Sequence, residues 1–294
     1  MDSMSEAYST TQAIRRYYEQ NTRLFLSFGS AAGTYAIHRA VWANGVQTLG
    51  RALDYSSELI LAEAQSLIVQ QSLDRVRVID LGCGVGSTLF YLAQHLDVPV
   101  QAVGLTISPI QAHLAHERAS RLQLPQACLF VEADFQSVPT AGDLDVAISV
   151  EAYVHAVDPD CFFAEAARVL RPRGKLILCD DFLSARATSP FLGDAERNWV
   201  LAYQQGWHIP NLCGEGCVQD LAREHGLSLV SDRDLTPHLR LRTLPNRLAA
   251  AVLNAGRRLP FRHAIVPSMT GSLALQHCLK LGLVQYRFLV FEKS

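Results

Sequence analysis

Three side chains that can move a proton stand together directly after an apolar segment. Glu151, Tyr153 and His155 follow residues 144–150, whose apolar run is typical of a buried strand. Carboxylate, phenol and imidazole groups can serve as general acids or bases, and a carboxylate can also stabilise a cation. In open α/β sheets, ligands collect at the carboxyl ends of the strands. We therefore predict that Glu151, Tyr153 and His155 are catalytic residues.

A second chemical signal is an acid next to a glycine-rich turn. Asp80 lies near the end of the apolar run 76–81, and glycines follow at every second position from 82 to 86. Residues 87–96 then show helical spacing of apolar side chains. A strand, a glycine turn and a helix form a nucleotide-type cofactor site, because glycine lets the backbone turn sharply and lets a ligand approach closely. Asp80 is placed to bind a cationic or hydroxylated ligand.

The remaining elements alternate between strands and helices. Further strands are expected at 98–105, 127–134, 175–180, 227–231 and 286–292, and helices at 11–20, 55–71, 109–118 and 160–170. Residues 1–10 are expected to be irregular. Ser108 is expected to cap the helix that Pro109 begins. Gly174 is expected to close the helix before the strand at 175–180.

The G-x-G-x-G turn, with an acid two residues ahead of it, resembles motif I of the class I methyltransferases that use S-adenosylmethionine. The resemblance covers about residues 75–183. It implies an α/β fold: a Rossmann-like, seven-stranded, mostly parallel sheet with helices on both faces. We expect an N-terminal helical lid at 1–72 and a cofactor-binding core at 73–294. Helical insertions are expected at about 184–215 and 232–284, before and after the sixth strand.

The turn after the second strand departs from the common pattern, in which an acid holds the ribose. Here the position is Leu105 or Thr106, and the segment 104–108 with Gln111 resembles cyclopropane fatty-acid synthases and tocopherol-type, sterol and other isoprenoid methyltransferases. Asp134 and Phe135 resemble the pair that borders the adenine in this family. The resemblance implies that the cofactor is held by Asp80, Gly82, Cys83, Gly84, Thr106, Ile107, Gln111, Asp134, Phe135 and Val150.

Two segments point to carbon methylation. Residues 151–156 resemble the Glu-Ala-x-x-His-Ala segment of sterol C-methyltransferases, and residues 17–22 resemble the Tyr-Tyr opening of terpenoid and prenyl-diphosphate methyltransferases. Methyl transfer to an alkene leaves a carbocation, which aromatic faces and a carboxylate can stabilise. We expect Glu151 to stabilise this cation and accept its proton. The residues expected to bind the substrate are Tyr17, Tyr18, Asn21, His38, Trp207 and His208, and a polar or diphosphate head could be held by His38, His155, His208, Arg240 and Arg242.

Two other functions stay open. An N- or O-methyltransferase of a small natural product would use Glu151 or His155 as an ordinary base. A methyltransferase-fold subunit that binds cofactor or a partner without catalysis is the other alternative. The intact glycine turn and Asp80 argue against this non-catalytic subunit.

Composition limits the partners. Hydrophobic residues make up 49% and charged residues 18%, and the net charge of −2 provides no basic field for nucleic acid. No apolar run spans a bilayer and no apolar signal core opens the chain, so we expect a cytoplasmic protein with a small-molecule substrate. A homo-oligomer is compatible with the sequence. No metal-ligand cluster is present, so Mg²⁺ would bind only through the oxygens of a diphosphate substrate.

Overall fold

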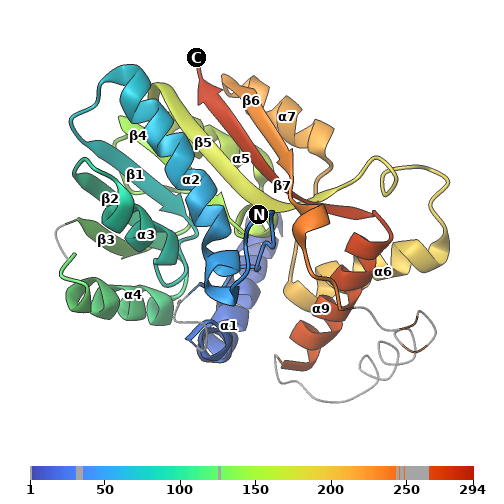
Figure 1. Ribbon diagram of the computed structural model, residues 1–294. Coiled ribbons are helices and arrows are strands. Elements are labelled where there is room, and N and C mark those ends of the chain that lie inside the picture. Colours follow the sequence, from blue (N-terminus) through green and yellow to red (C-terminus); the bar gives the residue numbers. More distant parts are fainter. Residues whose placement is uncertain (1, 31–35, 125–126, 243–244, 246–247, 249–264) are drawn as a thin grey trace.

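The computed structural model describes residues 2–30, 36–124, 127–242, 245, 248 and 265–294. A seven-stranded sheet with the order β3-β2-β1-β4-β5-β7-β6 forms its centre (Figure 1). β7 runs antiparallel to β5 and β6, whereas the other pairs are parallel. The strands are β1 (Val76–Leu81), β2 (Val100–Thr106), β3 (Cys128–Glu132), β4 (Leu144–Val150), β5 (Leu170–Leu183), β6 (Leu227–Asp234) and β7 (Val284–Lys293). The predicted fold class is confirmed.

Helices cover both faces of the sheet and a third group covers one of its edges. The helices are α1 (Asp2–Ser30), α2 (Leu49–Gln71), α3 (Ser87–His95), α4 (Pro109–Arg121), α5 (Pro159–Val169), α6 (Asp194–Trp207), α7 (Glu215–Glu224) and α9 (Ile265–Lys280), with short 3₁₀ turns η1 (Tyr153–His155) and η2 (Thr236–His238). One core layer joins the sheet to α2, α3 and α4, and the opposite layer joins it to α5 and α7. None of the described helices is both long enough and apolar enough to cross a lipid bilayer.

The alternation of side chains along β1 explains this two-sided core. Val76 and Val78 pack into one layer, whereas Ile79 and Leu81 pack into the other. A parallel strand covered on both faces is therefore apolar along its length, which is the pattern that the sequence shows. Because parallel strands end at the same edge, the turns after β1, β2 and β4 meet there.

The structure corrects several expected boundaries. α1 begins at Asp2, so residues 2–10 are helical rather than irregular. α2 begins at Leu49, where the Thr48 side chain accepts a hydrogen bond from the Arg51 backbone N–H. Gly174 does not close a helix, because α5 ends at Val169 and β5 has already begun at Leu170. The predicted Ser108 cap is present, and its hydroxyl accepts from the Gln111 N–H.

α1, α6 and α9 lie beyond the carboxyl edge of the sheet (Figure 1). α6 falls inside the insertion expected at 184–215, and η2 and α9 fall inside the one expected at 232–284. The helical pattern expected to reach residue 259 lies outside the described residues. α6 and α9 cross closely at two glycines: a Cβ built on Gly206 would lie 2.5 Å from the Gly271 Cα and 2.6 Å from the Pro267 carbonyl oxygen.

This crossing generates a stability prediction. Gly206→Ala should separate α6 from α9, because the clashing atoms are backbone and cannot rotate away. We expect a loss of about 1–3 kcal/mol in the free energy of unfolding, measured by urea denaturation. Gly216→Ala is the matched control, since no atom lies within 4 Å of a Cβ at that helical position. A Gly206→Ala protein as stable as the Gly216→Ala protein would contradict this packing.

Candidate active site

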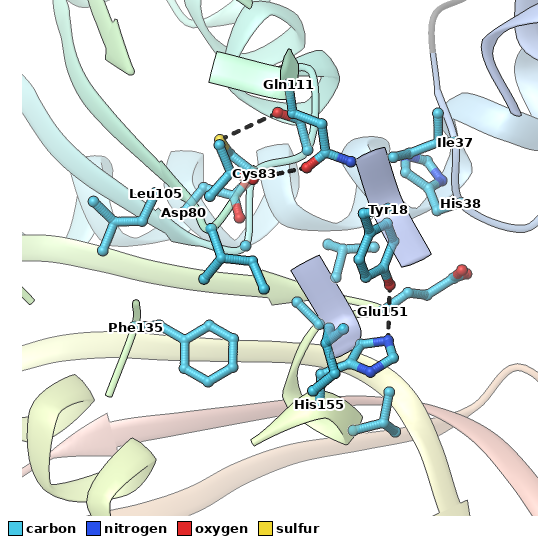
Figure 2. Close-up of a pocket in the computed structure, with 18 of the residues that line it drawn as sticks. Tyr18, Ile37, His38, Asp80, Cys83, Leu105, Gln111, Phe135, Glu151 and His155 are labelled. Carbon is cyan, nitrogen blue, oxygen red and sulfur yellow. Dashed lines mark hydrogen bonds between the residues drawn. The ribbon is translucent and has the colours of Figure 1, made fainter. Parts of the chain in front are cut away.

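A cavity of about 310 Å³ lies at the carboxyl edge of the sheet, where the turns after β1, β2 and β4 meet beneath α1 (Figure 2). All of the residues expected to bind the cofactor line it: Asp80, Gly82, Cys83, Gly84, Thr106, Ile107, Gln111, Asp134, Phe135 and Val150. α1 and residues 37–39 line the other side of the cavity. The residues that follow the strand ends in the sequence therefore lie around the same cavity in the fold.

The turn after β1 requires glycine. Gly82 and Gly84 have φ angles of +125° and +52°, a region that side chains with a Cβ rarely adopt. A Cβ on Gly82 would lie 2.3 Å from the Ala152 Cβ, and a Cβ on Gly84 would lie 2.9 Å from Ile37 Cδ1. The turn thus brings β1 close to the segment after β4 and leaves the backbone exposed to the cavity.

Asp80 is a buried acid without an internal partner for one oxygen. Its side chain is 3% exposed, and among the described residues nothing hydrogen-bonds its Oδ1 atom. Burial raises the pKa of Asp80 to about 7. A buried unpaired carboxylate is costly unless a cation or hydrogen-bond donor satisfies it. S-adenosylmethionine fits this requirement, because it carries a sulfonium and an ammonium group.

A chain of hydrogen bonds ties α1 to the turn after β2. The Thr106 hydroxyl donates to Gln111 Oε1 at 2.7 Å, and Gln111 Nε2 donates to the Thr22 hydroxyl at 3.1 Å. The Thr22 hydroxyl in turn donates to the Tyr18 carbonyl at 2.6 Å. The glutamine therefore holds the N-terminal helix over the cavity, next to the segment that the sequence associates with the cofactor.

The Asp134–Phe135 pair forms one wall of the cavity. Asp134 Oδ1 accepts from the Gln136 backbone N–H at 2.9 Å, which fixes the turn after β3. The Phe135 ring packs edge-on against Phe162 at 5.4 Å between centroids. The aromatic face and the neighbouring carboxylate are compatible with a purine.

Glu151 lies at the end of β4 with φ of +51°, which turns the chain sharply at this point. Its Oε1 atom accepts from the Arg39 backbone N–H at 2.8 Å, from Arg39 Nε at 3.3 Å and from the Tyr286 hydroxyl at 2.9 Å. Within the described part of the chain, its Oε2 atom has no hydrogen-bond partner. The side chain is 15% exposed and lines the cavity. One carboxylate oxygen is therefore fixed and the other is available.

His155 lines the same cavity from η1. Its Nε2 atom lies 2.7 Å from the Tyr18 hydroxyl, as the dashed line in Figure 2 shows. Burial lowers the pKa of His155 to about 4, so the ring is neutral at neutral pH. Asp180 orients η1, because its Oδ2 atom accepts from the Val154 N–H at 3.1 Å. Burial, and then the charge of Asp181, raise the pKa of Asp180 well above its ordinary value.

Other predicted substrate residues divide into two groups. Tyr17, Tyr18, His38 and Trp207 line the cavity, but Asn21 and His208 do not. Asn21 instead donates to the Tyr17 carbonyl at 2.8 Å, and the His208 ring packs edge-on against Tyr17 at 5.5 Å between centroids.

Three further predicted residues lie away from the cavity. Tyr153 is buried against Phe162 and Phe182, and its hydroxyl donates to Cys213 Sγ at 3.6 Å. The Arg240 guanidinium stacks on Trp42, and the Arg242 N–H bonds to Gln276. The structure therefore does not place Tyr153 in contact with a substrate, and it does not bring either arginine to a substrate head group.

The sequence reasoning missed the group that surrounds Glu151. Arg39 forms a two-pronged salt bridge with Asp181, with both N–O distances at 2.7 Å, and the Tyr203 hydroxyl also donates to Asp181. Asp180 and Asp181 lie near the carboxyl end of β5, where ligands collect in α/β sheets. The sequence therefore contained a signal for this acidic pair. Nothing local in the sequence marks Arg39 or Tyr286, whereas Tyr203 is one of the aromatic residues of the insertion expected at 184–215.

Comparisons with known proteins agree with this fold and site. Residues 79–178 match the family model described as "Methyltransferase domain". The chain is 30% identical over 164 residues to a chloroplastic tocopherol O-methyltransferase of Arabidopsis thaliana, a match that covers 54% of this chain and 45% of that protein. It is 29% identical over 162 residues to 24-methylenesterol C-methyltransferase 2 of Oryza sativa subsp. japonica, covering 54% and 43%. The matches span about half the length of these relatives.

A solved structure of geranyl diphosphate methyltransferase in complex with GPP and sinefungin is similar over 97% of this chain and 100% of that chain, with a TM-score of 0.75 and 18% identity. At this identity the likeness concerns the fold. Residues 79–178 therefore carry a methyltransferase domain, and the chain as a whole has a Rossmann-like methyltransferase fold. The relatives that share part of this chain include sterol and tocopherol methyltransferases.

The described residues contain no group of three or more histidine, cysteine or acidic side chains placed to hold a metal ion.

Asp80 generates a prediction about pH. S-adenosylmethionine should bind best to the ionised carboxylate, so its affinity should fall as the pH drops below about 7, by about tenfold at pH 6. Asp80→Asn should bind more weakly at every pH and should lose most of this dependence. Isothermal titration calorimetry from pH 6 to 8 measures both. Asp143→Asn is the control, because Asp143 has a largely exposed carboxylate.

Asp80→Asn should weaken cofactor binding but should stabilise the cofactor-free protein against unfolding. Because the folded-state pKa of Asp80 is raised, its contribution to stability is lost as pH rises from the ordinary value of 3.8 to about 7. Asp80→Asn should therefore raise the melting temperature more at pH 8 than at pH 5. Equal affinity and equal melting temperatures for wild type and variant would refute the assignment of Asp80.

Proposed function

We propose that this protein transfers the methyl group of S-adenosylmethionine to a carbon atom of an isoprenoid alkene, a prenyl diphosphate or a terpenoid. The observation that carries the proposal is Glu151: a mostly buried carboxylate with one oxygen fixed by three donors and the other available beside the cavity. An alkene acceptor needs a group that tolerates positive charge and then takes a proton. A fixed carboxylate beside the cavity meets both needs.

Each part of the cavity would have a separate task. Bound S-adenosylmethionine supplies an electrophilic methyl group on a sulfonium sulfur. Asp80 would bind the cationic end of the cofactor, and the Gly82–Gly84 backbone would lie against its ribose. The rings of Tyr18 and Trp207 would line the acceptor and exclude water, which strengthens electrostatic interactions in the cavity.

The electron pair of the acceptor's C=C bond would form the new C–C bond as the S–CH₃ bond breaks and its pair stays on sulfur. A carbocation is left on the neighbouring acceptor carbon. Glu151 would stabilise this charge and accept a proton from an adjacent carbon, whose C–H electron pair forms the new double bond. The proton would then pass from Glu151 to solvent.

The charges around the cavity support a cationic intermediate. Among the described lining residues, four carboxyl side chains stand against one guanidinium, that of Arg39, which is already paired with Asp181 and Glu151. The four are Asp80, Asp134, Glu151 and Asp180. Burial raises the pKa of Asp180 well above its ordinary value, so this acid is neutral, and Asp80, with a pKa of about 7, is only partly ionised near neutral pH. The ionised members of the set favour positive charge in the cavity. A diphosphate acceptor would bring Mg²⁺ through its own oxygens, because the described residues provide no protein cage for the ion.

An O-methyltransferase is the second candidate. A tocopherol O-methyltransferase is among the relatives, and the neutral ring of His155 hydrogen-bonds a phenol, that of Tyr18, in the cavity. In this case His155 or Glu151 would act as the base for an acceptor hydroxyl. The cytoplasmic location and the oligomeric state stay predictions.

The test is a turnover screen. The protein is given S-adenosylmethionine with geranyl and farnesyl diphosphates plus Mg²⁺, with uncharged terpenoids, and with phenols. Mass spectrometry detects the gain of one methylene, and NMR locates the new methyl group. A methyl on carbon supports the first candidate, and methylation confined to oxygen or nitrogen would overturn it.

Glu151→Gln should bind S-adenosylmethionine as wild type does and should lower turnover by at least about tenfold to a hundredfold, because the amide keeps the size of the side chain but cannot accept the proton. Turnover is measured with the acceptor found in the screen, and affinity by calorimetry. Glu117→Gln on exposed α4 is the matched control. Full activity of Glu151→Gln would remove Glu151 from the mechanism.

A further inference from the structure

Arg39 connects the segment between α1 and α2 to β5, to β7 and to the end of β4 at the carboxyl edge of the sheet. Its guanidinium forms two hydrogen bonds with Asp181 of β5 and lies over the Tyr286 ring of β7, 4.2 Å from the ring centroid. Tyr203 of α6 reaches the same carboxylate. The Arg39 Nε and backbone N–H groups reach Glu151 at the end of β4.

Hydrogen bonds fix the backbone that follows Arg39. The Val41 N–H donates to the Ala52 carbonyl and the Trp42 N–H donates to the His238 carbonyl, both at 2.7 Å. The segment is thus attached to α2 and to η2. Arg39 therefore reaches Glu151 from a segment that is anchored directly after it, and 17% of the Arg39 side chain is exposed.

The Arg39–Asp181 pair has good geometry for a buried ion pair. Asp181 is 1% exposed, and both of its oxygens accept from the guanidinium, which places two planar groups edge to edge. Because lysine offers a point charge rather than a planar fork, it cannot bond Asp181 and Glu151 with the same geometry. The fork fixes the direction in which Nε points, and Nε points to Glu151.

The Arg39 guanidinium also contacts Tyr286, the other side chain that donates to Glu151. It stacks on the Tyr286 ring, whose hydroxyl donates to Glu151 Oε1 at 2.9 Å. Arg39 thus supplies two of the three donors to Oε1 and packs against the residue that supplies the third. With Oε1 fixed in this way, rotation of the carboxylate is restricted and the direction of Oε2 is set.

We propose that Arg39, anchored by Asp181, is a positioning residue that sets which acceptor proton Glu151 removes. This inference rests on the proposed carbon methylation. A carbocation has C–H bonds on more than one neighbouring carbon, and each gives a different double-bond isomer when its proton leaves. A carboxylate held in one direction selects one isomer, and a loosened one selects less strictly.

The experiment compares Arg39→Lys with Arg287→Lys. Arg287, on β7, is a matched control because its side chain is also mostly buried, 14% exposed, and bonded to a carboxylate, that of Asp232, at 2.7 Å. It does not line the cavity. Turnover uses the acceptor from the screen, chosen so that its cation has hydrogens on two different neighbouring carbons. Gas chromatography with mass spectrometry gives the isomer ratio.

Arg39→Lys should lower kcat by about tenfold or more, leave the KM for S-adenosylmethionine within about twofold, and yield a mixture of double-bond isomers where wild type yields mainly one. Arg287→Lys should keep the wild-type isomer ratio even if its melting temperature falls. Tyr286→Phe should shift the ratio in the same direction but less, since it removes one donor and leaves the Arg39–Asp181 pair intact. This variant carries the test if Arg39→Lys does not fold.

An unchanged isomer ratio and kcat in Arg39→Lys, or in Tyr286→Phe if the lysine variant does not fold, would overturn the positioning role while leaving carbon methylation in place. An equal shift in Arg287→Lys would show a general effect of packing and would also overturn it. A wild-type protein that methylates only oxygen or nitrogen would instead overturn the proposed function, and the two failures are therefore distinguishable.

Discussion

Burial of several carboxyl groups at one edge of the sheet is the constraint on which the site depends. Removing a carboxylate from water is costly unless charges or hydrogen bonds replace the lost solvation. Asp181 is satisfied by Arg39 and Tyr203, and Asp180 accepts from two backbone N–H groups. Asp80 differs, because one of its oxygens has no partner among the described residues. The protein thus stabilises the acids that organise the site and leaves one unsatisfied for a ligand.

Most of the side chains that bond to these buried acids come from outside the first five strands and their helices. Arg39 precedes α2, Tyr203 lies on α6, and Tyr286 lies on β7, while Thr22 of α1 bonds to Gln111. The helices beyond the sheet edge therefore cover the cavity and also supply hydrogen-bond donors to the polar groups of the site. A change in this cover would alter both the shape of the cavity and the position of Glu151.

The sequence predicts the sheet well, and it predicts which strand-end residues gather around one cavity, because both depend on local patterns. The apolar run at 144–150 coincides with β4, and the glycine turn and strand ends place residues as distant as Asp80 and Asp134 around one cavity. Element ends are predicted less well. β5 begins at Leu170 because the backbone pairs with Leu144 and then shifts register before Lys175, a tertiary effect with no local pattern.

The segment after β4 shows where local reasoning stops. Glu151, Tyr153 and His155 alternate as they would along a strand, but the left-handed φ at Glu151 and the 3₁₀ turn that follows end that alternation. Glu151 and His155 line the cavity, whereas Tyr153 turns into a cluster of phenylalanines. Arg39 was missed for a different reason: its salt-bridge partner Asp181 is 142 positions away, so only the folded chain brings them together.

The arrangement of acids also bears on how rate enhancement could arise in the proposed reaction. Positive charge begins on the sulfonium and moves to the acceptor carbon as the methyl group is transferred. Asp80 and Glu151 lie at different places around the cavity (Figure 2), at the ends of β1 and β4. A carboxylate near the cofactor stabilises the charge before transfer, and one near the acceptor stabilises it afterwards. Only the second interaction grows as the transition state forms, so Glu151 would accelerate the reaction whereas Asp80 would mainly bind. A fixed Glu151 needs little reorganisation at that moment, which is why the residues that hold it matter as much as the carboxylate itself.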